Sequence, residues 1–420
     1  MADTYANTAP AGLPERPVQM RRTFTLWSSF AFALAFISPC VALYGVFNLS
    51  ITTAGPAFWL GFPLIFVAQF VIALALSELV SRWPVEGSIY QWSRRLLGLR
   101  GGWIGGWVYI WTLVVSLASV ATFAASFAAR VIGVTPTGWQ LAGLTVAFLA
   151  LGTGVNVAGS LALRIVVTTS IIAETLGTVG VGIVLLFHRH QPLSVLGHGP
   201  SGPINGAFLT GPMLLAVAIL GYSFVGFESV GSVAEEVHTP HRTVPRALVF
   251  SMAFVAVIVC FAGLGLILAT PDMGAVLGGK VADPVYSTLT VNLGGTAAKG
   301  FEVLFTIAFL ASFLAVQTTA SRMIWSYGRD RALPAYRALT RLTPKHREPA
   351  VALTVATAVA VVIVVLGQAT PQVYQLLLNF SAAGFFAAYL FPLAGSVYRR
   401  LRNDWSSGSF SLGRISLASR

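Results

Sequence analysis

Charged residues are scarce in this chain. Only 10% of its 420 residues are Asp, Glu, Lys or Arg, whereas 56% are hydrophobic. A soluble domain of this length carries about a quarter charged residues, so the composition excludes an ordinary soluble protein. Apolar stretches long enough to cross a bilayer recur along the whole length, and the alternating short strands of an outer-membrane barrel are absent. We therefore expect an all-α polytopic membrane protein embedded in a lipid bilayer.

Residues that carry catalytic or metal chemistry are also few. The two cysteines, Cys40 and Cys260, lie in apolar segments, which favours free buried thiols. All six histidines fall in loops, and the pair His238 and His241 has no further ligands to complete a metal site. The sequence contains no P-loop, Gly-rich phosphate loop, nucleophile elbow or metal cluster. These absences predict that the protein is not an enzyme and has neither a cofactor nor a metal site.

Positive charge is concentrated on one side of the predicted membrane. The net charge is +12, and all but four of the 26 Lys and Arg residues fall in alternate loops; the exceptions are Arg130, Arg189, Lys280 and Lys299. This positive-inside pattern argues against a nucleic-acid partner and predicts a multi-pass protein of the cytoplasmic membrane with both termini in the cytoplasm. The polar segment Met1–Met20 has no apolar core, so we expect a disordered tail rather than a cleaved signal peptide.

Ten membrane spans are predicted, an even number as two cytoplasmic termini require. They cover Phe24–Asn48, Phe58–Val80, Trp103–Ala129, Trp139–Val157, Leu163–Phe187, Ala207–Ala234, Ala247–Ala269, Gly300–Tyr327, Ala350–Leu366 and Val373–Ser396. They group into two five-helix units, 24–187 and 207–396, which are joined by an extracellular loop at 188–206 and flanked by cytoplasmic tails at 1–23 and 397–420. A unit with an odd number of spans inserts its second copy upside down, which is the inverted-repeat arrangement of many secondary transporters.

Two segments outside the spans are expected to be structured. Pro84–Leu99 predicts an amphipathic helix on the cytoplasmic membrane surface, because Ile89 and Trp92 share an apolar face. Asp272–Gly295 is either a short helix over an outer vestibule or a plain surface loop.

The first and sixth spans are both interrupted near mid-depth. The sixth contains two glycines and an acid within Gly221–Glu228. The first contains Pro39, which cannot donate a backbone hydrogen bond, and Ser38, a hydroxyl that can satisfy a freed backbone group. Broken helices at corresponding positions of two repeats indicate a transport pathway.

Three motifs resemble those of the amino acid–polyamine–organocation (APC) superfamily of permeases. Residues 224–228 (FVGFE) and 235–246 (EEVHTPHRTVPR) are similar to the signature that follows the sixth helix of that family. Residues 77–90 (SELVSRWPVEGSIY) and 321–334 (SRMIWSYGRDRALP) resemble the segments after its second and eighth helices. The resemblance covers nearly the whole chain, is closest to the amino acid/choline branch, and implies a leucine-transporter-type five-plus-five inverted repeat.

The chain departs from the family pattern in three places. Many relatives have GSG in the first-helix loop, where this chain has Ser38–Ala42. Relatives usually have twelve helices, whereas ten are predicted here. Some proton-coupled relatives place a lysine in the fifth helix, near where this chain has Glu174.

The two breaks predict a dipolar cradle for a substrate. In the first span the outer half begins near Val41 with free N–H groups that suit a carboxylate, and the inner half ends near Ile37 with carbonyl groups that suit an ammonium. The sixth span, running inward, offers carbonyl groups near Leu220 and N–H groups near Gly226. The residues expected to contact substrate are Ser38, Pro39, Cys40, Val41, Ala42, Gly221, Tyr222, Ser223, Phe224 and Gly226.

Two aromatic residues of the cradle have two interpretations. The resemblance implies that the aromatic side chain of Tyr222 closes over the bound substrate, and Phe224 would face its side chain. The alternative for both is packing or lipid contact. Tyr109 and Trp111 of the third span can contribute to the site or to the core.

Two acids are candidates for coupling. Glu174 lies about 15 Å into the fifth span, at 1.5 Å per residue, where a carboxyl must face the protein interior. It is either a proton carrier or a fixed hydrogen-bond partner of the first helix's broken backbone. Glu228 either contributes to coupling or has a structural role, in which it ties the inner half of the sixth helix to neighbours, or to Arg82 or Arg322. Glu78, Glu235, Glu236 and the group 329–331 are expected in gate or scaffold ion pairs.

A sodium ion is the alternative coupling ion. A sodium site in this fold takes oxygens from the first and eighth helices, and the eighth offers Ser312, Gln317, Thr318 and Thr319. The sequence therefore predicts a secondary active transporter that moves an amino acid or related amine by alternating access, with proton coupling. An exchanger and a non-transporting membrane sensor are the alternatives, and the oligomeric state stays open.

Overall fold

The fold comes from a computed structural model that describes residues 22–370, 372–406 and 408–412. Most of the predicted N-terminal tail (1–23) and the end of the predicted C-terminal tail (413–420) lie outside the described residues. The described part contains ten helical segments long and apolar enough to cross a membrane. The expectation of an all-α protein with ten spans is therefore confirmed.

Several of the ten segments are built from more than one helix. The first consists of α1 (Leu26–Ile37) and α2 (Pro39–Ala54), the second of a 3-10 turn (Pro56–Leu60) and α3 (Gly61–Arg82), and the third of α4 (Ser88–Val131). The fourth is α5 (Gly138–Val157), and the fifth joins α6 (Ser160–Glu174), a π-helical turn (Thr175–Gly180) and α7 (Val181–Leu186). The sixth comprises α9 (Pro212–Leu220), a 3-10 turn (Gly221–Phe224) and α10 (Ser229–Ser232). The last four are α11 (Pro240–Leu268), α14 (Gly295–Arg329), α16 (Ala350–Gly367) and α17 (Val373–Leu401).

Short elements connect these segments. They are a 3-10 turn (Leu193–Gly197), the two-residue strands β1 (His198–Gly199) and β2 (Gly202–Pro203), α8 (Gly206–Thr210), a 3-10 turn (Ala234–Glu236), α12 (Met273–Leu277), α13 (Pro284–Leu293) and α15 (Tyr336–Leu339). β1 and β2 pair antiparallel. The segment Asp272–Gly295 thus holds two short helices rather than a plain loop.

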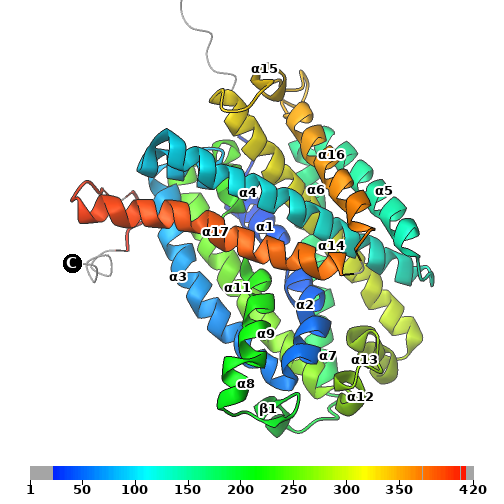
Figure 1. Cartoon of the computed structure of the whole chain (residues 1–420). Helices are drawn as coiled ribbons and strands as arrows, with labels where there is room; N and C mark the ends of the chain where they lie inside the picture. The colour runs from blue at the N-terminus through cyan, green and yellow to red at the C-terminus, as the bar shows by residue number, and fades with distance from the viewer. Residues whose placement is uncertain (1–21, 371, 407, 413–420) are drawn as a thin grey trace, which may run out of the picture.

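The first segment forms the centre of the bundle. In its most apolar stretch 94% of the residues are buried, against 28% for the segments of α5 and α16. α1 and α2 pack against α9, α11 and α14, whereas α4 lies along α14 and α17 (Figure 1). Burial on all sides explains why a break in this segment contacts only protein.

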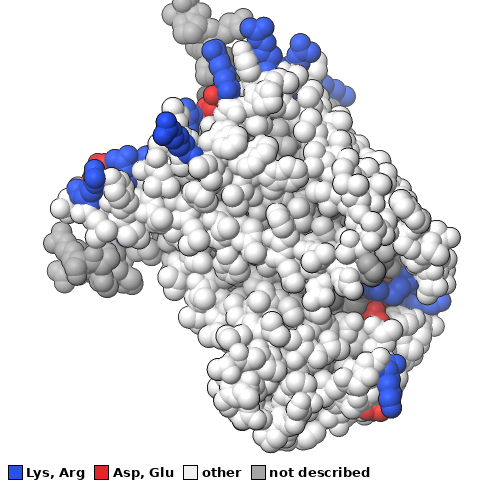
Figure 2. Space-filling view, in the orientation of Figure 1, with Lys and Arg blue, Asp and Glu red and all other residues white. Residues whose placement is uncertain are grey.

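The two ends of the bundle differ in charge. Figure 2 shows Lys and Arg side chains gathered at the end that carries α15 and the C-terminal part of α17, with a small group near the other end. We call the first of these the basic end. The opposite end carries α12, α13 and the β1–β2 hairpin (Figure 1). The separation follows the unequal distribution of Lys and Arg over alternate loops.

The predicted amphipathic helix at Pro84–Leu99 has a different partner from the one expected. The helix begins at Ser88 and continues past Gly98 (φ 81°, ψ −174°) into the rest of α4. Its Trp92 is fully buried, donates a hydrogen bond to the Trp83 carbonyl at 3.0 Å, and lies against Gly231 of α10. The apolar face therefore packs on protein, not on lipid.

Candidate substrate site

The break in the first segment is one residue wide. Ser38 separates α1 from α2 with φ 48° and ψ 110°, and Pro39 begins α2. Proline is favoured at that position because its missing N–H has no helical partner to lose and its φ suits a helix. The Ser38 side-chain oxygen accepts a hydrogen bond from the Val41 N–H at 3.2 Å, so the serine caps the outer half-helix.

Glu174 is bonded to this break. Its Oε1 accepts a hydrogen bond from the Ser38 hydroxyl at 2.6 Å, and its Oε2 accepts one from the Cys40 N–H at 3.2 Å. The side chain is 1% exposed. The contact is the one expected of a fixed partner for the broken backbone.

The N–H groups at the start of the outer half-helix, which were predicted to bind a substrate carboxylate, already donate hydrogen bonds within the protein. Pro39 has no N–H, the Cys40 N–H donates to Glu174, and the Val41 N–H donates to the Ser38 side chain. The chain's own carboxylate lies where a substrate carboxylate was expected.

A π-helical turn places Glu174 on the break. Glu174 ends α6 directly before the turn Thr175–Gly180. The Gly177 carbonyl, within the turn, accepts a hydrogen bond from the Tyr44 hydroxyl at 2.7 Å, and Thr178 lies 3.3 Å from the Cys40 thiol. Such bulges occur frequently at functional sites. Here the bulge holds the fifth segment against α2.

The break in the sixth segment is wider. α9 ends at Leu220, a 3-10 turn follows, Val225 is extended, and Gly226 has φ 94°. A Cβ atom at Gly226 would lie 2.0 Å from the ring of Phe36 in α1. Only glycine fits this position, because it meets both a positive φ and a close approach to the first segment.

Glu228 is held by two tyrosines. Its Oε1 accepts a hydrogen bond from the Tyr109 hydroxyl at 2.6 Å and its Oε2 accepts one from the Tyr389 hydroxyl at 2.5 Å. The Gly226 N–H donates to the same Tyr389 hydroxyl at 3.2 Å. Tyr389 is not among the predicted site residues; in the sequence it is marked only by being a phenol within the tenth apolar segment.

Of the structural partners predicted for Glu228, neighbouring segments hold it through the two tyrosines, whereas Arg82 and Arg322 do not contact it. The Arg322 guanidinium pairs with Glu236 at 3.1 Å and with Glu348 at 2.5 Å, and the Arg82 guanidinium lies 4.3 Å from the ring centre of Trp83. Both arginines belong to the basic end, whereas the carboxyl of Glu228 points to the tyrosines of the third and tenth segments.

Side-chain hydrogen bonds also occupy carbonyl groups at the breaks. The Ser223 hydroxyl donates to the Ala42 carbonyl at 2.7 Å, which joins the two breaks directly. The Gln69 amide donates to the Gly221 carbonyl at 2.8 Å. Gly221 is a predicted site residue, whereas Gln69 is not. These bonds hold the sixth segment against its neighbours.

The four residues of α14 that were candidates for a sodium site do not all point to the first break. The Ser312 hydroxyl donates to the Phe36 carbonyl at 3.1 Å, so it reaches the first break. Gln317 and Thr318 bond instead to Asn156 of α5, and Thr319 bonds to a carbonyl of its own helix. One of the four residues is at the break.

Tyr222 and Phe224 are both buried. Tyr222 is 6% exposed, and Phe224, fully buried, makes edge contacts with the rings of Phe62 and Phe66, each with a centroid distance of 6.2 Å. Tyr109 is fully buried against Glu228, whereas Trp111 is 39% exposed. Phe224 therefore packs on α3 in this conformation.

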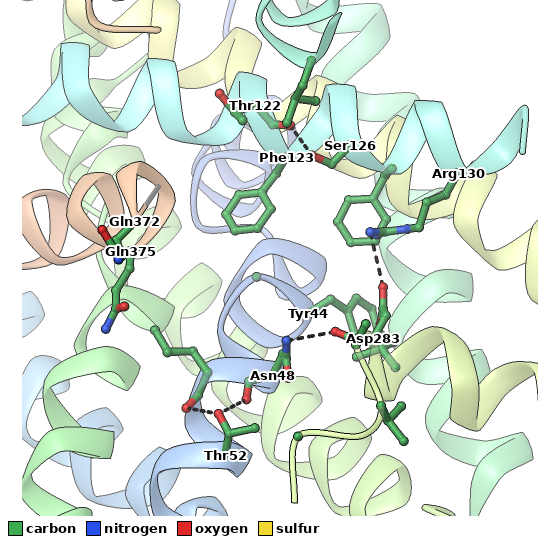
Figure 3. A pocket seen from close by; sticks show the side chains of 18 residues that line it. Tyr44, Asn48, Thr52, Thr122, Phe123, Ser126, Arg130, Asp283, Gln372 and Gln375 are labelled. Carbon is green, nitrogen blue, oxygen red and sulfur yellow. Dashed lines mark hydrogen bonds and ion pairs between the residues drawn. The ribbon is translucent and has the colours of Figure 1, made fainter. Parts of the chain in front are cut away.

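A cavity of about 700 Å³ lies toward the opposite end (Figure 3). Its walls come from α2, α4, α5, α13, α17 and nearby loops. The residues that Figure 3 labels on them are Tyr44, Asn48, Thr52, Thr122, Phe123, Ser126, Arg130, Asp283, Gln372 and Gln375. None of the ten predicted substrate residues lines it. We refer to this cavity as the polar pocket.

Aromatic rings lie between the polar pocket and the first break. Tyr44 and Phe127 line the pocket, and their rings pack on Phe305 with centroid distances of 4.1 and 5.8 Å. Phe305 in turn lies within 3.4 Å of the position that a Cβ of Gly177 would take, beside the Cys40 thiol. The rings of Tyr44, Phe127 and Phe305 therefore separate the pocket from the first break.

The basic end is closed by ion pairs. Besides the two bonds of Arg322, Arg329 pairs with Glu235 at 2.9 Å and Arg400 pairs with Glu78 at 2.6 Å. These acids were expected in gate or scaffold pairs, and they are paired. Glu86, buried in the same cluster, has two carboxyl oxygens with no hydrogen-bond partner among the described residues. Burial and the neighbouring carboxylates of Glu236 and Glu235 raise its pKa well above the usual range.

Nearly the whole chain matches one known protein family. The family model described as amino acid permease matches residues 19–417. The chain belongs to the amino acid permease family. The APC identification made from the three motifs is thus confirmed, while the narrower resemblance to the amino acid/choline branch stays a prediction.

Similar proteins are transporters of amines and amino acids by name. The chain is 25% identical over 350 residues to the low-affinity putrescine importer PlaP of Escherichia coli strain K12, a match that covers 82% of this chain and 74% of that protein. It is 23% identical over 389 residues to the branched-chain amino acid permease BcaP of Lactococcus lactis. That match covers 86% of this chain and 78% of BcaP. The protein is therefore a multi-pass permease of the amino acid and polyamine type.

A solved structure shows the same fold. The match is to Mhp1, a nucleobase-cation-symport-1 family transporter in a closed conformation with bromovinylhydantoin bound, at a TM-score of 0.63 and 15% identity. It covers 96% of this chain and 84% of that one. The leucine-transporter type of fold predicted from the resemblance is confirmed.

Proposed function

We propose that this permease is a secondary active transporter that moves an amino acid or related amine across the cytoplasmic membrane by alternating access. The basic end faces the cytoplasm together with both termini, as the positive-inside rule requires. The polar pocket then opens outward, while the ion pairs of Arg322 and Arg329 close the cytoplasmic side. A cavity on one side and a closed gate on the other favour a carrier over a channel, and no enzymatic step is part of the proposal.

Glu174 is the proposed proton carrier, and its bonds to Ser38 and Cys40 are the observation that carries this assignment. As a carboxylate, it accepts from the Ser38 hydroxyl and the Cys40 N–H at the same time. A protonated carboxyl has a donor of its own and less capacity to accept. Protonation therefore changes the contact between the fifth segment and the first break, which links proton binding to a change in helix packing. Neither a cofactor nor a metal enters this proposal.

Uptake into proteoliposomes tests the function. Labelled leucine, putrescine and related compounds are offered under an imposed pH gradient, in sodium-free buffer and in sodium buffer. We expect accumulation without sodium that collapses when a protonophore is added. Accumulation that requires sodium and survives the protonophore would contradict proton coupling, and the absence of uptake and exchange for every compound would contradict transport.

Exchange is the second candidate, and the geometry of Glu174 favours it in one respect. Both carboxyl oxygens are bonded to the first break, so the acid can also serve as a permanent cap that never changes its charge. In that case uptake is stimulated by substrate inside the vesicle and does not respond to the pH gradient. Efflux measurements with and without external substrate distinguish the two modes.

A further inference from the structure

The polar pocket contains a charge cluster that the mechanism above does not use. The Arg130 guanidinium pairs with Glu302 at 3.0 Å and with Asp283 at 3.3 Å, the latter drawn in Figure 3. The same guanidinium lies 4.1 Å from the ring centre of Phe127. A cation, the carboxylate of Asp283 and an aromatic face therefore meet at the pocket wall, and the buried carboxylate of Glu302 contacts the same cation from behind that wall.

The fixed charge of this cluster favours a cation. Two carboxylates face one guanidinium, which leaves an excess of one negative charge when all three groups are ionised. The other basic residues assigned to this side (Arg189, Lys280 and Lys299) are exposed and do not line the pocket. Glu302 is 1% exposed, and its Oε1 has no hydrogen-bond partner among the described residues. A buried carboxyl oxygen without a partner gains more from a nearby donor than an exposed one does.

The uncharged lining also suits an organic cation. Tyr44, Phe123 and Phe127 supply aromatic surfaces, which attract ammonium and guanidinium groups when they lie over the ring face. Asn48, whose amide donates to the Ala282 carbonyl at 3.3 Å, leaves its amide oxygen as an acceptor for an N–H donor. The pocket thus offers a cation the same kinds of partner that Arg130 already has.

A second observation, at the breaks, points the same way. The N–H groups that begin the outer half of the first segment donate to Glu174 and Ser38, and the Gly226 N–H of the sixth donates to Tyr389. A substrate carboxylate finds no free donor at these positions, and it would approach the carboxyl groups of Glu174 and Glu228. Desolvating a carboxylate without donors is strongly unfavourable.

We infer that the polar pocket is a binding site for the ammonium or guanidinium group of an amine that carries no carboxylate, and that Arg130 is a tethered occupant which such an amine replaces. The inference rests on the proposed transport function and narrows its substrate class to organic amines. On binding, the amine takes the contacts of Arg130 with Asp283 and the face of Phe127. Arg130 then turns away from Asp283 into the pocket.

Matched pairs of compounds that differ only by a carboxylate test the substrate class. The pairs are agmatine and arginine, putrescine and ornithine, cadaverine and lysine, and isopentylamine and leucine. Binding to the purified permease is measured by calorimetry, and competition is measured against labelled agmatine in proteoliposomes. We expect each amine to bind at least tenfold more tightly than its amino acid.

Two asparagine variants locate the site. Asp283 caps α13 by accepting from the Tyr286 N–H at 3.0 Å, and Asp272 caps α12 by accepting from the Ala275 N–H at 2.8 Å. Asparagine preserves such a cap, so Asp283→Asn and Asp272→Asn change the charge at two equivalent helix ends. Asp283→Asn is expected to weaken agmatine binding at least fivefold, and Asp272→Asn, away from the pocket, by less than twofold.

Arg130→Gln tests the tethered occupant separately. Removal of the resident guanidinium leaves both carboxylates for the amine, so agmatine should bind more tightly, with an unchanged elution profile in size-exclusion chromatography. Unchanged or weaker binding would overturn the role of Arg130 as a competitor.

The outcomes separate the site from the transport function. Tight amine binding without any flux supports the site and overturns transport. If amino acids are transported and each amine binds no more tightly than its matched amino acid, transport is supported and the inference is overturned. Equal effects of Asp283→Asn and Asp272→Asn also overturn it, because the charge would then act at long range and not through contact.

Discussion

The two helix breaks each contain a buried glutamate, yet the glutamates are held in different ways. Glu174 comes from another segment and bonds to the hydroxyl and backbone of the first break. Glu228 belongs to the sixth segment itself and bonds to the phenols of Tyr109 and Tyr389. The first acid thus bridges two separate segments at the break, while the second is enclosed within a side-chain network.

Because the two glutamates are held differently, we expect protonation to change helix packing at the first break and not at the second. Glu174 lies next to a π-helical turn, so a change in its two bonds alters how the fifth segment packs on the first. Glu228 has neutral phenol donors from two other segments, and Tyr389 also accepts from the backbone at Gly226. We therefore propose that coupling takes place at the first break and that the second break is a scaffold.

The largest effect is expected at the backbone of the second break. Gly226→Ala should lower the free energy of unfolding by on the order of 3 kcal/mol, because the new Cβ meets Phe36 at a position with φ 94°. Gly221→Ala is the matched control: Gly221 has an ordinary φ of −52°, and its Cβ would lie 3.0 Å from Phe386, so a change within about 1 kcal/mol is expected. Chemical unfolding in detergent measures both. Equal stability of the two variants would show that the sixth segment can shift away from α1.

Glu228→Gln is expected to have the next largest effect. Its amide has one oxygen for two phenol donors, so one tyrosine loses an acceptor and stability falls by about 2 kcal/mol. Transport driven by a pH gradient, normalised to folded protein, should persist. Loss of that accumulation with retained exchange would move the coupling site to the second break.

Glu174→Gln tests the first break directly. We expect substrate accumulation to fall about tenfold, equivalent to about 1.4 kcal/mol of driving force, while exchange stays within about threefold. The reason is that glutamine still offers an oxygen and hydrogen-bonding capacity to Ser38 but cannot carry a proton. An equal loss of both activities in a well-folded variant would identify Glu174 as a structural acid.

The smallest effects are expected at Ser38. Ser38→Ala removes the cap of α2 and one bond to Glu174, with a cost of about 1 kcal/mol in unfolding free energy. Ser38→Gly loses the same bonds but relieves a positive φ, so it should be less destabilising. If Ser38→Gly lowers the unfolding free energy more than Ser38→Ala does, the backbone at residue 38 is not strained and the cap alone holds the break.

The positions of both breaks could be predicted from the sequence because their causes are local. Pro39 lacks an N–H, and Gly226 permits a positive φ, whatever surrounds them. Glu174 could be recognised for a similar reason, since a carboxyl within an apolar segment has to find a partner.

The partners themselves could not be predicted in the same way. A tyrosine in an apolar segment has the same sequence pattern whether or not its hydroxyl bonds to an acid. Tyr389 meets Glu228 because α17 packs against the sixth segment. The cluster in the polar pocket joins Arg130, Asp283 and Glu302 from three separate elements. Such meetings depend on tertiary packing, which single-residue patterns do not encode.

The thiol of Cys40 makes the first break observable by chemistry. It lies beside Thr178 at 3.3 Å, fully buried next to the carboxyl of Glu174, and Cys260 is the other cysteine of the chain. With Cys260 replaced by serine, Cys40 is the one native thiol that remains, at the centre of the bundle. Its alkylation rate by a small maleimide then records how often the closed interior admits water, and saturation with substrate or a change of pH shifts that rate without any label having to be introduced.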